Sequence, residues 1–79
     1  MRLDKYLKVS RLIKRRTVAN EACDNQRVCI NGKIAKAGSE VKVGDEITIS
    51  FGNKEVKVKV TGIEETVKKE TAASLFEYI

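Results

Sequence analysis

The sequence predicts an α+β fold in which two N-terminal helices pack on a small, mostly antiparallel sheet. Residues 2–25 show a helical period, and from Val28 onward the period of apolar residues changes to two. Pairs typical of turns separate the alternating segments, namely Asn31-Gly32, Gly44-Asp45 and Gly52-Asn53. Neither the helices nor the sheet can bury an apolar face alone, so we expect the helices to cover part of the sheet.

A stripe at i, i+3, i+4 and i+7 predicts the first helix and consists of Leu3, Tyr6, Leu7 and Ser10. A break is expected around residues 10–14. A second short helix should follow over residues 18–25, with Thr17 as its N-cap. Small apolar residues on this second helix would allow the two helices to approach closely.

The strands are predicted by alternation between turns. Val28 and Ile30 lead into Asn31-Gly32, the strongest short hairpin signal, after which the return strand starts. Two further alternating runs follow, and they are built on Ile47, Ile49 and Phe51 and on Val56, Val58 and Val60. We expect the strands to end near residue 63. In the tail, residues 64–79, a short helix over residues 70–78 would fold Ala72, Leu75, Phe76 and Ile79 back on the sheet.

The 79 residues form one domain with a small core, and their charge is distributed unevenly. Residues 1–36 contain ten basic and three acidic residues, whereas residues 37–79 contain six lysines, no arginine and eight acidic residues. All five arginines therefore lie in the basic part. Arginine suits bidentate contact with phosphate and stacking on bases, so this bias indicates a polyanionic partner, above all nucleic acid.

The same composition argues against other classes of function. The chain has no histidine, the commonest general base, and no nucleophile or phosphate-loop motif, so we expect neither an enzyme nor a cofactor. Cys23 and Cys29 lack the spacing and the partners of a zinc site and are expected to be free thiols in a reducing cytoplasm. No apolar run is long enough for a membrane span. Phe51, Phe76 and Tyr78 are too scattered for a base-stacking platform.

The basic residues around the second helix are the candidate binding site. Lys14, Arg15 and Arg16 precede the predicted helix start, where free N–H groups and the helix dipole already favour an anion. Arg11, Lys8 and Lys5 extend this surface, and Arg27, Asn31 and Lys33 could flank it from the hairpin. Asp4 is the one acid in the first helix. It suits the helix dipole and can pair with Arg2, Lys8 or a later arginine, either structurally or to orient a phosphate contact.

Four ordered segments of the sequence resemble the S4 RNA-binding domain. They are residues 2–7 (RLDKYL), 15–19 (RRTVA), 28–33 (VCINGK) and 44–47 (GDEI). The resemblance covers residues 2–51 and implies an S4-like αL motif. Within this family, the chain most resembles the stand-alone bacterial type, which includes the heat-shock S4 protein and a factor of ribosome quality control. The chain ends at Ile79 without the basic extension of the larger heat-shock relative, which favours the shorter type.

The resemblance also implies a site and partners. The site comprises Arg2, Lys5, Lys8, Arg11, Lys14, Arg15, Arg16 and Thr17, with contributions near Asn31 and Lys33. The implied partners are the 50S subunit with its 23S rRNA, peptidyl-tRNA and, as a further candidate, RqcH, which adds alanine tails. The implied function is support of C-terminal tailing on obstructed 50S subunits by a cytoplasmic monomer that recognises RNA by shape. Two alternatives stay open: a stand-alone S4 protein in rRNA processing or ribosome assembly, and a protein–protein adaptor that uses its sheet edge.

Overall fold

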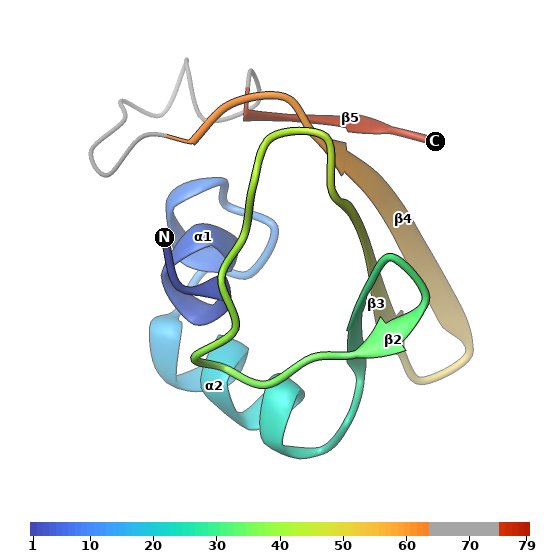
Figure 1. Ribbon diagram of the computed structural model, residues 1–79. Helices are drawn as coiled ribbons and strands as arrows, with labels where there is room; N and C mark the ends of the chain where they lie inside the picture. The colour runs from blue at the N-terminus through green and yellow to red at the C-terminus, as the bar shows by residue number, and fades with distance from the viewer. Residues whose placement is uncertain (64–74) are drawn as a thin grey trace.

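The computed structural model describes residues 1–63 and 75–79 and confirms the predicted α+β architecture. Two helices, α1 (Leu3–Val9) and α2 (Arg16–Asp24), lie together against one face of an antiparallel sheet (Figure 1). The sheet has the strand order β2-β1-β3-β4-β5. Its strands are β1 (Val28–Ile30), β2 (Lys33–Ile34), β3 (Glu46–Phe51), β4 (Lys54–Val60) and β5 (Phe76–Tyr78).

The first helix forms as the apolar stripe predicted. Leu3, Tyr6 and Leu7 are fully buried, and Ser10 follows as the buried C-cap of α1. The chain then leaves the helix in the predicted break, where Arg11 adopts a positive φ of 62° that ends the helical path. The buried Ile13 anchors this connection, because its amide donates to the carbonyl oxygen of Leu7 at 3.1 Å.

The second helix begins earlier than the sequence suggested, and the prediction of Thr17 as its N-cap is wrong. Arg15 is the N-cap, with extended backbone angles, and its carbonyl oxygen accepts the amide of Ala19 at 3.0 Å. In the described part of the chain, no side chain caps this helix start. Thr17 therefore lies inside the first turn. Asn25, predicted to be the last helical residue, is the C-cap.

The hairpin between β1 and β2 has the predicted turn. Asn31 and Gly32 have φ values of 52° and 82°, the pair of positive angles that a two-residue type I′ turn requires. The register joins Ile30 to Lys33 directly across this turn. Gly52 likewise turns the chain between β3 and β4, whose register runs on from the pair of Phe51 and Lys54.

The last strand is not the helix that the tail sequence suggested. Residues 76–78 form β5, which pairs with β4 through Val58–Tyr78 and Val60–Phe76, while residues 64–74, including the expected contact of Ala72, lie outside the described part. The strands therefore continue beyond residue 63. Leu75 does fold back into the core, and its carbonyl oxygen accepts the hydroxyl of Tyr6 at 2.6 Å. Ile79, in contrast, is exposed. Pairing with the edge of β4 satisfies the backbone of residues 76–78, which a local helical pattern cannot foresee.

A long irregular segment between β2 and β3 completes the core. It buries Ala35, Ala37 and Val41 and passes beside the chain N-terminus (Figure 1). Its carbonyl groups bond the start of α1: Leu3 donates to Ser39 at 2.8 Å and Asp4 to Ala37 at 3.1 Å. The N-terminus and the first turn of α1 are therefore held in a fixed position.

Candidate nucleic-acid interface

The start of α2 has the features that an anion site requires. Arg15, Arg16 and Thr17 are exposed there, the first turn contains no acidic residue, and within residues 1–63 and 75–79 no side chain caps its amides. The first amides of a helix carry the positive end of its dipole and lack partners within the helix. A phosphate placed here would meet backbone donors and arginine side chains together.

The start of α1 offers no comparable backbone site. Two of its first amides donate to the loop carbonyls of Ser39 and Ala37, as described above. The amide of Lys5 donates to Asp4 Oδ1 at 2.8 Å. Helix α1 can therefore offer an anion its basic side chains but not its first amides.

Asp4 joins the two helices beneath this surface. Its side chain is only 2% exposed, yet it carries a carboxylate, which burial alone would destabilise. Asp4 Oδ1 lies 3.4 Å from Arg2 Nε, and Asp4 Oδ2 lies 3.4 Å from both Arg16 Nε and Asn20 Nδ2. Burial raises the pKa of Asp4, but the hydrogen bonds from the Lys5 amide, Arg16 and Asn20 outweigh it, so the pKa lies below its ordinary value.

This arrangement fixes two arginines without removing them from solvent. The side chains of Arg2 and Arg16 remain 57% and 48% exposed while their Nε atoms face Asp4. A guanidinium has five N–H donors, so the others stay available to a ligand. The structure shows the structural pairing of Asp4 directly, and its role in orienting a phosphate contact stays a prediction. Sequence reasoning missed Asn20, whose spacing of four from Arg16 places both residues on one face of α2.

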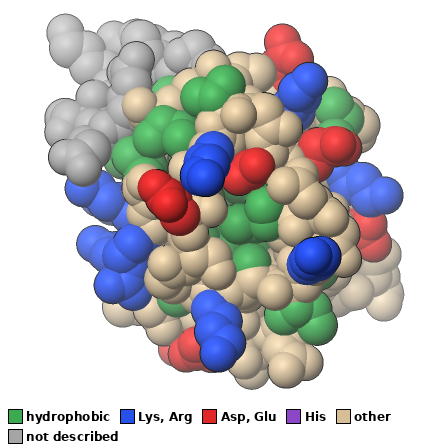
Figure 2. Space-filling view, in the orientation of Figure 1, with side chains coloured by type: hydrophobic (Ala, Val, Ile, Leu, Met, Phe, Trp, Pro, Cys, Tyr) green, Lys and Arg blue, Asp and Glu red, His purple; other side chains and the backbone are tan. Residues whose placement is uncertain are grey.

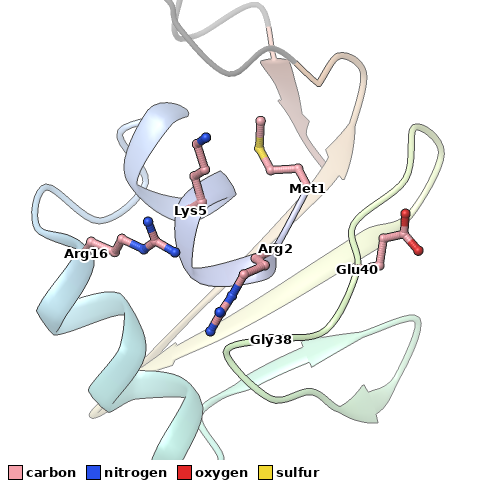
Figure 3. A pocket seen from close by; sticks show the side chains of 6 residues that line it. All are labelled: Met1, Arg2, Lys5, Arg16, Gly38 and Glu40. Carbon is pink, nitrogen blue, oxygen red and sulfur yellow. The ribbon is translucent and has the colours of Figure 1, made fainter.

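A hollow of about 520 Å³ opens above these pairs, and we call it the Asp4 hollow (Figure 3). Figure 3 shows Arg16 reaching from α2 toward α1, with Lys5 and Arg2 on either side of its guanidinium. Glu40 lies on the opposite side of the hollow. The residues that line it are Met1, Arg2, Lys5, Arg16, Gly38 and Glu40. Three basic side chains thus converge on a space open to solvent.

A second hollow, of about 210 Å³, lies in the connection between the helices, and we call it the loop hollow. Lys8, Arg11 and Lys14 line it together with Val9. The left-handed backbone at Arg11 folds the connection so that these three exposed side chains meet. The basic residues predicted around the two helices therefore group into two neighbouring clusters, with Arg15 and Thr17 exposed at the start of α2.

The two hairpin residues of the predicted site are placed differently. Asn31 uses its side chain internally: its Nδ2 donates to Asp45 Oδ1 at 3.2 Å, and its Oδ1 accepts the amide of Glu46 at 3.0 Å. Lys33 is exposed on the edge strand β2. Neither residue lines the Asp4 hollow or the loop hollow. Asn31 thus has a structural role in closing the hairpin against β3.

The charge asymmetry of the sequence is visible on the surface. In Figure 2 several Lys and Arg side chains lie along the left-hand edge, where Figure 1 places the helices. Basic and acidic side chains alternate along the right-hand edge, over the strands. Strand β4 itself carries both signs of charge, because Lys57 Nζ lies 3.6 Å from Glu55 Oε1 on it. The helices therefore present the less balanced, more basic side.

Comparison with known proteins agrees with this geometry. The S4 domain family matches residues 1–47, more than half of the chain. The chain belongs to the S4 domain family. A relative from Halalkalibacterium halodurans is 60% identical over 98% of this S4 chain and 88% of its own length, and one from Bacillus subtilis is 59% identical over 96% and 88%. Both relatives are named RQC P-site tRNA stabilizing factor.

Solved structures show the same S4 fold. The trimeric structure of Vibrio cholerae Heat Shock Protein 15 superposes with a TM-score of 0.92 at 29% identity, covering the whole S4 chain and 81% of that protein. The solution structure of a hypothetical protein gives 0.85 at 31% identity and covers 96% of that chain. These findings confirm the predicted fold and the predicted resemblance to the stand-alone type of ribosome quality control. They also confirm the expectation of a binding protein rather than an enzyme, because this family is non-enzymatic.

The described residues of the S4 chain were also compared with the requirements of a membrane span and of a metal site. Neither helix of the described residues is long and apolar enough to cross a membrane. Among residues 1–63 and 75–79, no three His, Cys, Asp or Glu side chains come together as a metal site would require. Cys23 is buried and Cys29 is half-buried, and both are free thiols. Burial raises the pKa of Cys23 to about 11, so its thiol stays protonated at neutral pH.

Proposed function

We propose that this protein binds the 23S rRNA and the P-site tRNA of obstructed 50S subunits and so supports C-terminal tailing of stalled nascent chains. The observation that carries the proposal is the Asp4 hollow, where Arg2, Lys5 and Arg16 converge beside the uncapped start of α2. The names of its full-length relatives supply the context of ribosome quality control and P-site tRNA. The protein acts in the cytoplasm as a monomer, and RqcH is its candidate partner on the subunit.

The proposed mode of binding follows from the chemistry of one surface, which we call the basic surface. It consists of the basic residues of the two hollows together with Arg15 and Thr17. Phosphate oxygens accept charge-assisted hydrogen bonds from arginine, and A-form RNA presents its phosphates and 2′-hydroxyls more openly than its base edges. Binding by this surface therefore reads RNA shape more than sequence. Two clusters side by side suit two backbone segments, such as an rRNA hairpin and a tRNA.

Crosslinking the tagged protein to ribosomal particles and sequencing the bound RNA tests the proposal. We expect 23S rRNA and tRNA fragments together. Recovery of rRNA precursors without tRNA would favour the alternative role in rRNA processing or ribosome assembly. Recovery of neither RNA above background would contradict the proposal.

Salt dependence separates RNA binding from the adaptor alternative. If about four to six phosphates are neutralised, the logarithm of the association constant falls with the logarithm of salt concentration at a slope of roughly −3 to −5. Each Arg→Ala change in the basic surface should make that slope shallower by about one unit or less. A nearly flat dependence would indicate hydrophobic association through the sheet edge instead.

A further inference from the structure

A groove of about 130 Å³ separates α2 from the end of β3, away from the residues that line the two basic hollows. The helix contributes to it through positions spaced by three and four residues, which lie on one face. The sheet side contributes the last residues of β3 and the residue that precedes β1. The helix side consists of Val18, Glu21, Ala22 and Asn25, and the sheet side of Arg27, Ser50 and Phe51.

Phe51 contributes an aromatic side chain to the wall of this groove. Phe51 shares the helix-facing side of β3 with Ile47 and Ile49, but it lies at the strand end and remains 44% exposed. Val18 opposite is 46% exposed. The other aromatic side chains near the sheet, Phe76 and Tyr78, form an edge-to-face pair at 5.3 Å. Among the described residues Phe51 has no such aromatic partner.

Three polar side chains of the groove are also available to bind a ligand. In the described part of the chain, the side chains of Asn25, Arg27 and Ser50 make no hydrogen bond or ion pair with another residue. Their backbone is nevertheless fixed, because the amide of Ser50 donates to the carbonyl oxygen of Arg27 at 2.8 Å. The left-handed residue Gln26, with φ of 59°, turns the chain from α2 into this wall. The backbone that carries these side chains is thus fixed, while their donors and acceptors make no bond within the described residues.

We propose that this groove binds one unpaired base of the RNA, stacked on Phe51; this proposal rests on the proposed function. Unstacked bases are recognised by aromatic rings that cover their face and by polar groups that meet their edges. The side-chain amide of Asn25 can donate and accept at a base edge, while the carboxylate of Glu21 accepts from an amino group. Arg27 is placed to meet the phosphate of the same nucleotide.

The position of the groove on the surface favours a nucleotide over a protein side chain. Ile13, which also lines the groove, directly precedes Lys14 of the loop hollow. The loop hollow and the groove therefore meet at consecutive residues, so an RNA strand held by the loop hollow can reach the groove. An apolar protein side chain would cover Phe51 and Val18 but leave the surrounding polar groups unmatched.

Titration of the full chain by NMR tests the base site, with single-stranded oligocytidylate and a blunt RNA duplex as the two probes. We expect the single strand to shift the ring protons of Phe51 upfield and to perturb the amides near Ser50. Phe51→Leu keeps an apolar side chain but removes the aromatic face, so affinity for the single strand should fall about tenfold. Phe51→Trp keeps a stacking ring and should retain that affinity. The duplex, which offers no unpaired base, should bind both variants as it binds the wild type.

Asn25→Ala is a second test that does not alter the apolar wall. It should lower the affinity for the single strand by about two- to tenfold and leave the affinity for the duplex unchanged. Unchanged affinity of Phe51→Leu and Asn25→Ala for the single strand would overturn the proposal and point to a protein contact at this groove. Equal loss for duplex and single strand would also overturn it, since Phe51 would then be a structural residue. Arg16→Ala separates the two proposals: if that variant binds the duplex as tightly as the wild type, the proposed function fails, whatever the groove does.

Discussion

Asp4 Oδ2 and Arg16 Nε lie 3.4 Å apart and join the two helices across twelve positions of sequence. The carboxylate is buried, whereas the arginine is about half exposed. The buried acid therefore orients a basic side chain that faces solvent. The same acid also contacts Arg2, so one buried carboxylate sets the direction of both arginines of the Asp4 hollow.

Replacement of Asp4 by Asn separates the effect of net surface charge from the effect of arginine orientation, because the two predict opposite changes in RNA affinity. The change makes the surface more positive, so an interface governed by net charge would bind RNA more tightly. We expect weaker binding to 50S subunits carrying tRNA, by about fivefold or more, because an orienting charge-assisted bond to Arg16 is lost. Affinity measurements on folded protein at constant salt distinguish the two. Tighter binding by Asp4→Asn would show that orientation is unimportant.

Replacement of Arg16 by Ala tests the basic surface itself. Hydrogen bonds to charged groups contribute roughly 1.5–3 kcal/mol, so binding to ribosomal particles should weaken about tenfold or more. The fold should persist, because Arg16 is exposed, and circular dichroism would check this. The matched control is the double change of Lys57 and Lys59 to Ala on the mixed surface of β4, which should matter much less. A comparable loss in that control would extend the binding surface onto the sheet.

The pKa of Asp4 predicts how stability depends on pH. Its native pKa lies below the ordinary value of 3.8, so the unfolded state takes up the proton first as the pH falls. The stability that the ionised Asp4 contributes is therefore complete well above pH 3.8 and is lost as the pH falls through the native pKa. Denaturant unfolding across pH 2 to 7 should show a gap in stability between wild type and Asp4→Asn that narrows toward acid. A gap that stays constant would mean that Asp4 titrates as it does in the unfolded chain.

The hydroxyl of Tyr6 predicts an effect on stability alone. It donates to the carbonyl oxygen of Leu75 at 2.6 Å in the core, but that oxygen also accepts the amides of Thr61 at 2.9 Å and Gly62 at 3.2 Å. Tyr6→Phe therefore leaves no buried acceptor unpaired and should cost about 1 kcal/mol, a Tm decrease of roughly 4–8 °C for a domain of this size. RNA affinity should stay unchanged, which makes this variant a stability control for the others. A large loss of binding would connect the C-terminal strand to the interface.

The elements that the sequence predicted well are those with local causes. The stripe of Leu3, Tyr6 and Leu7 needs only helical periodicity, and the turn at Asn31-Gly32 needs only positive φ angles. The start of α2 and the strand β5 depend on contacts far along the chain. Arg15 begins the helix although it is a poor cap, and residues 76–78 pair with β4 in place of the helix that their local pattern suggested.

The candidate site shows the same division. Charge and arginine bias selected the basic residues of both helices, but no pattern in the sequence divided them between two hollows. That division follows from the left-handed turn at Arg11 and from the buried Asp4. Asn31 was predicted as a site residue because it lies in a hairpin near basic residues. Its side-chain bonds to Asp45 and Glu46 give it another role, which only the tertiary structure reveals.

The tie between the N-terminus and the irregular segment has a practical consequence for labelling. The carbonyl oxygen of Met1 accepts a hydrogen bond from the amide of Val41 at 2.9 Å, and Arg2 forms a β-bridge with Glu40. Met1 also lines the Asp4 hollow. An affinity tag or fluorophore fused ahead of Met1 would therefore emerge at the rim of the proposed phosphate site and compete with RNA for that space. Ile79 is exposed at the end of β5 and does not line that hollow. Tags and reporter groups attached after Ile79 should leave the basic surface accessible, and paired experiments with the two fusion positions would measure the obstruction directly.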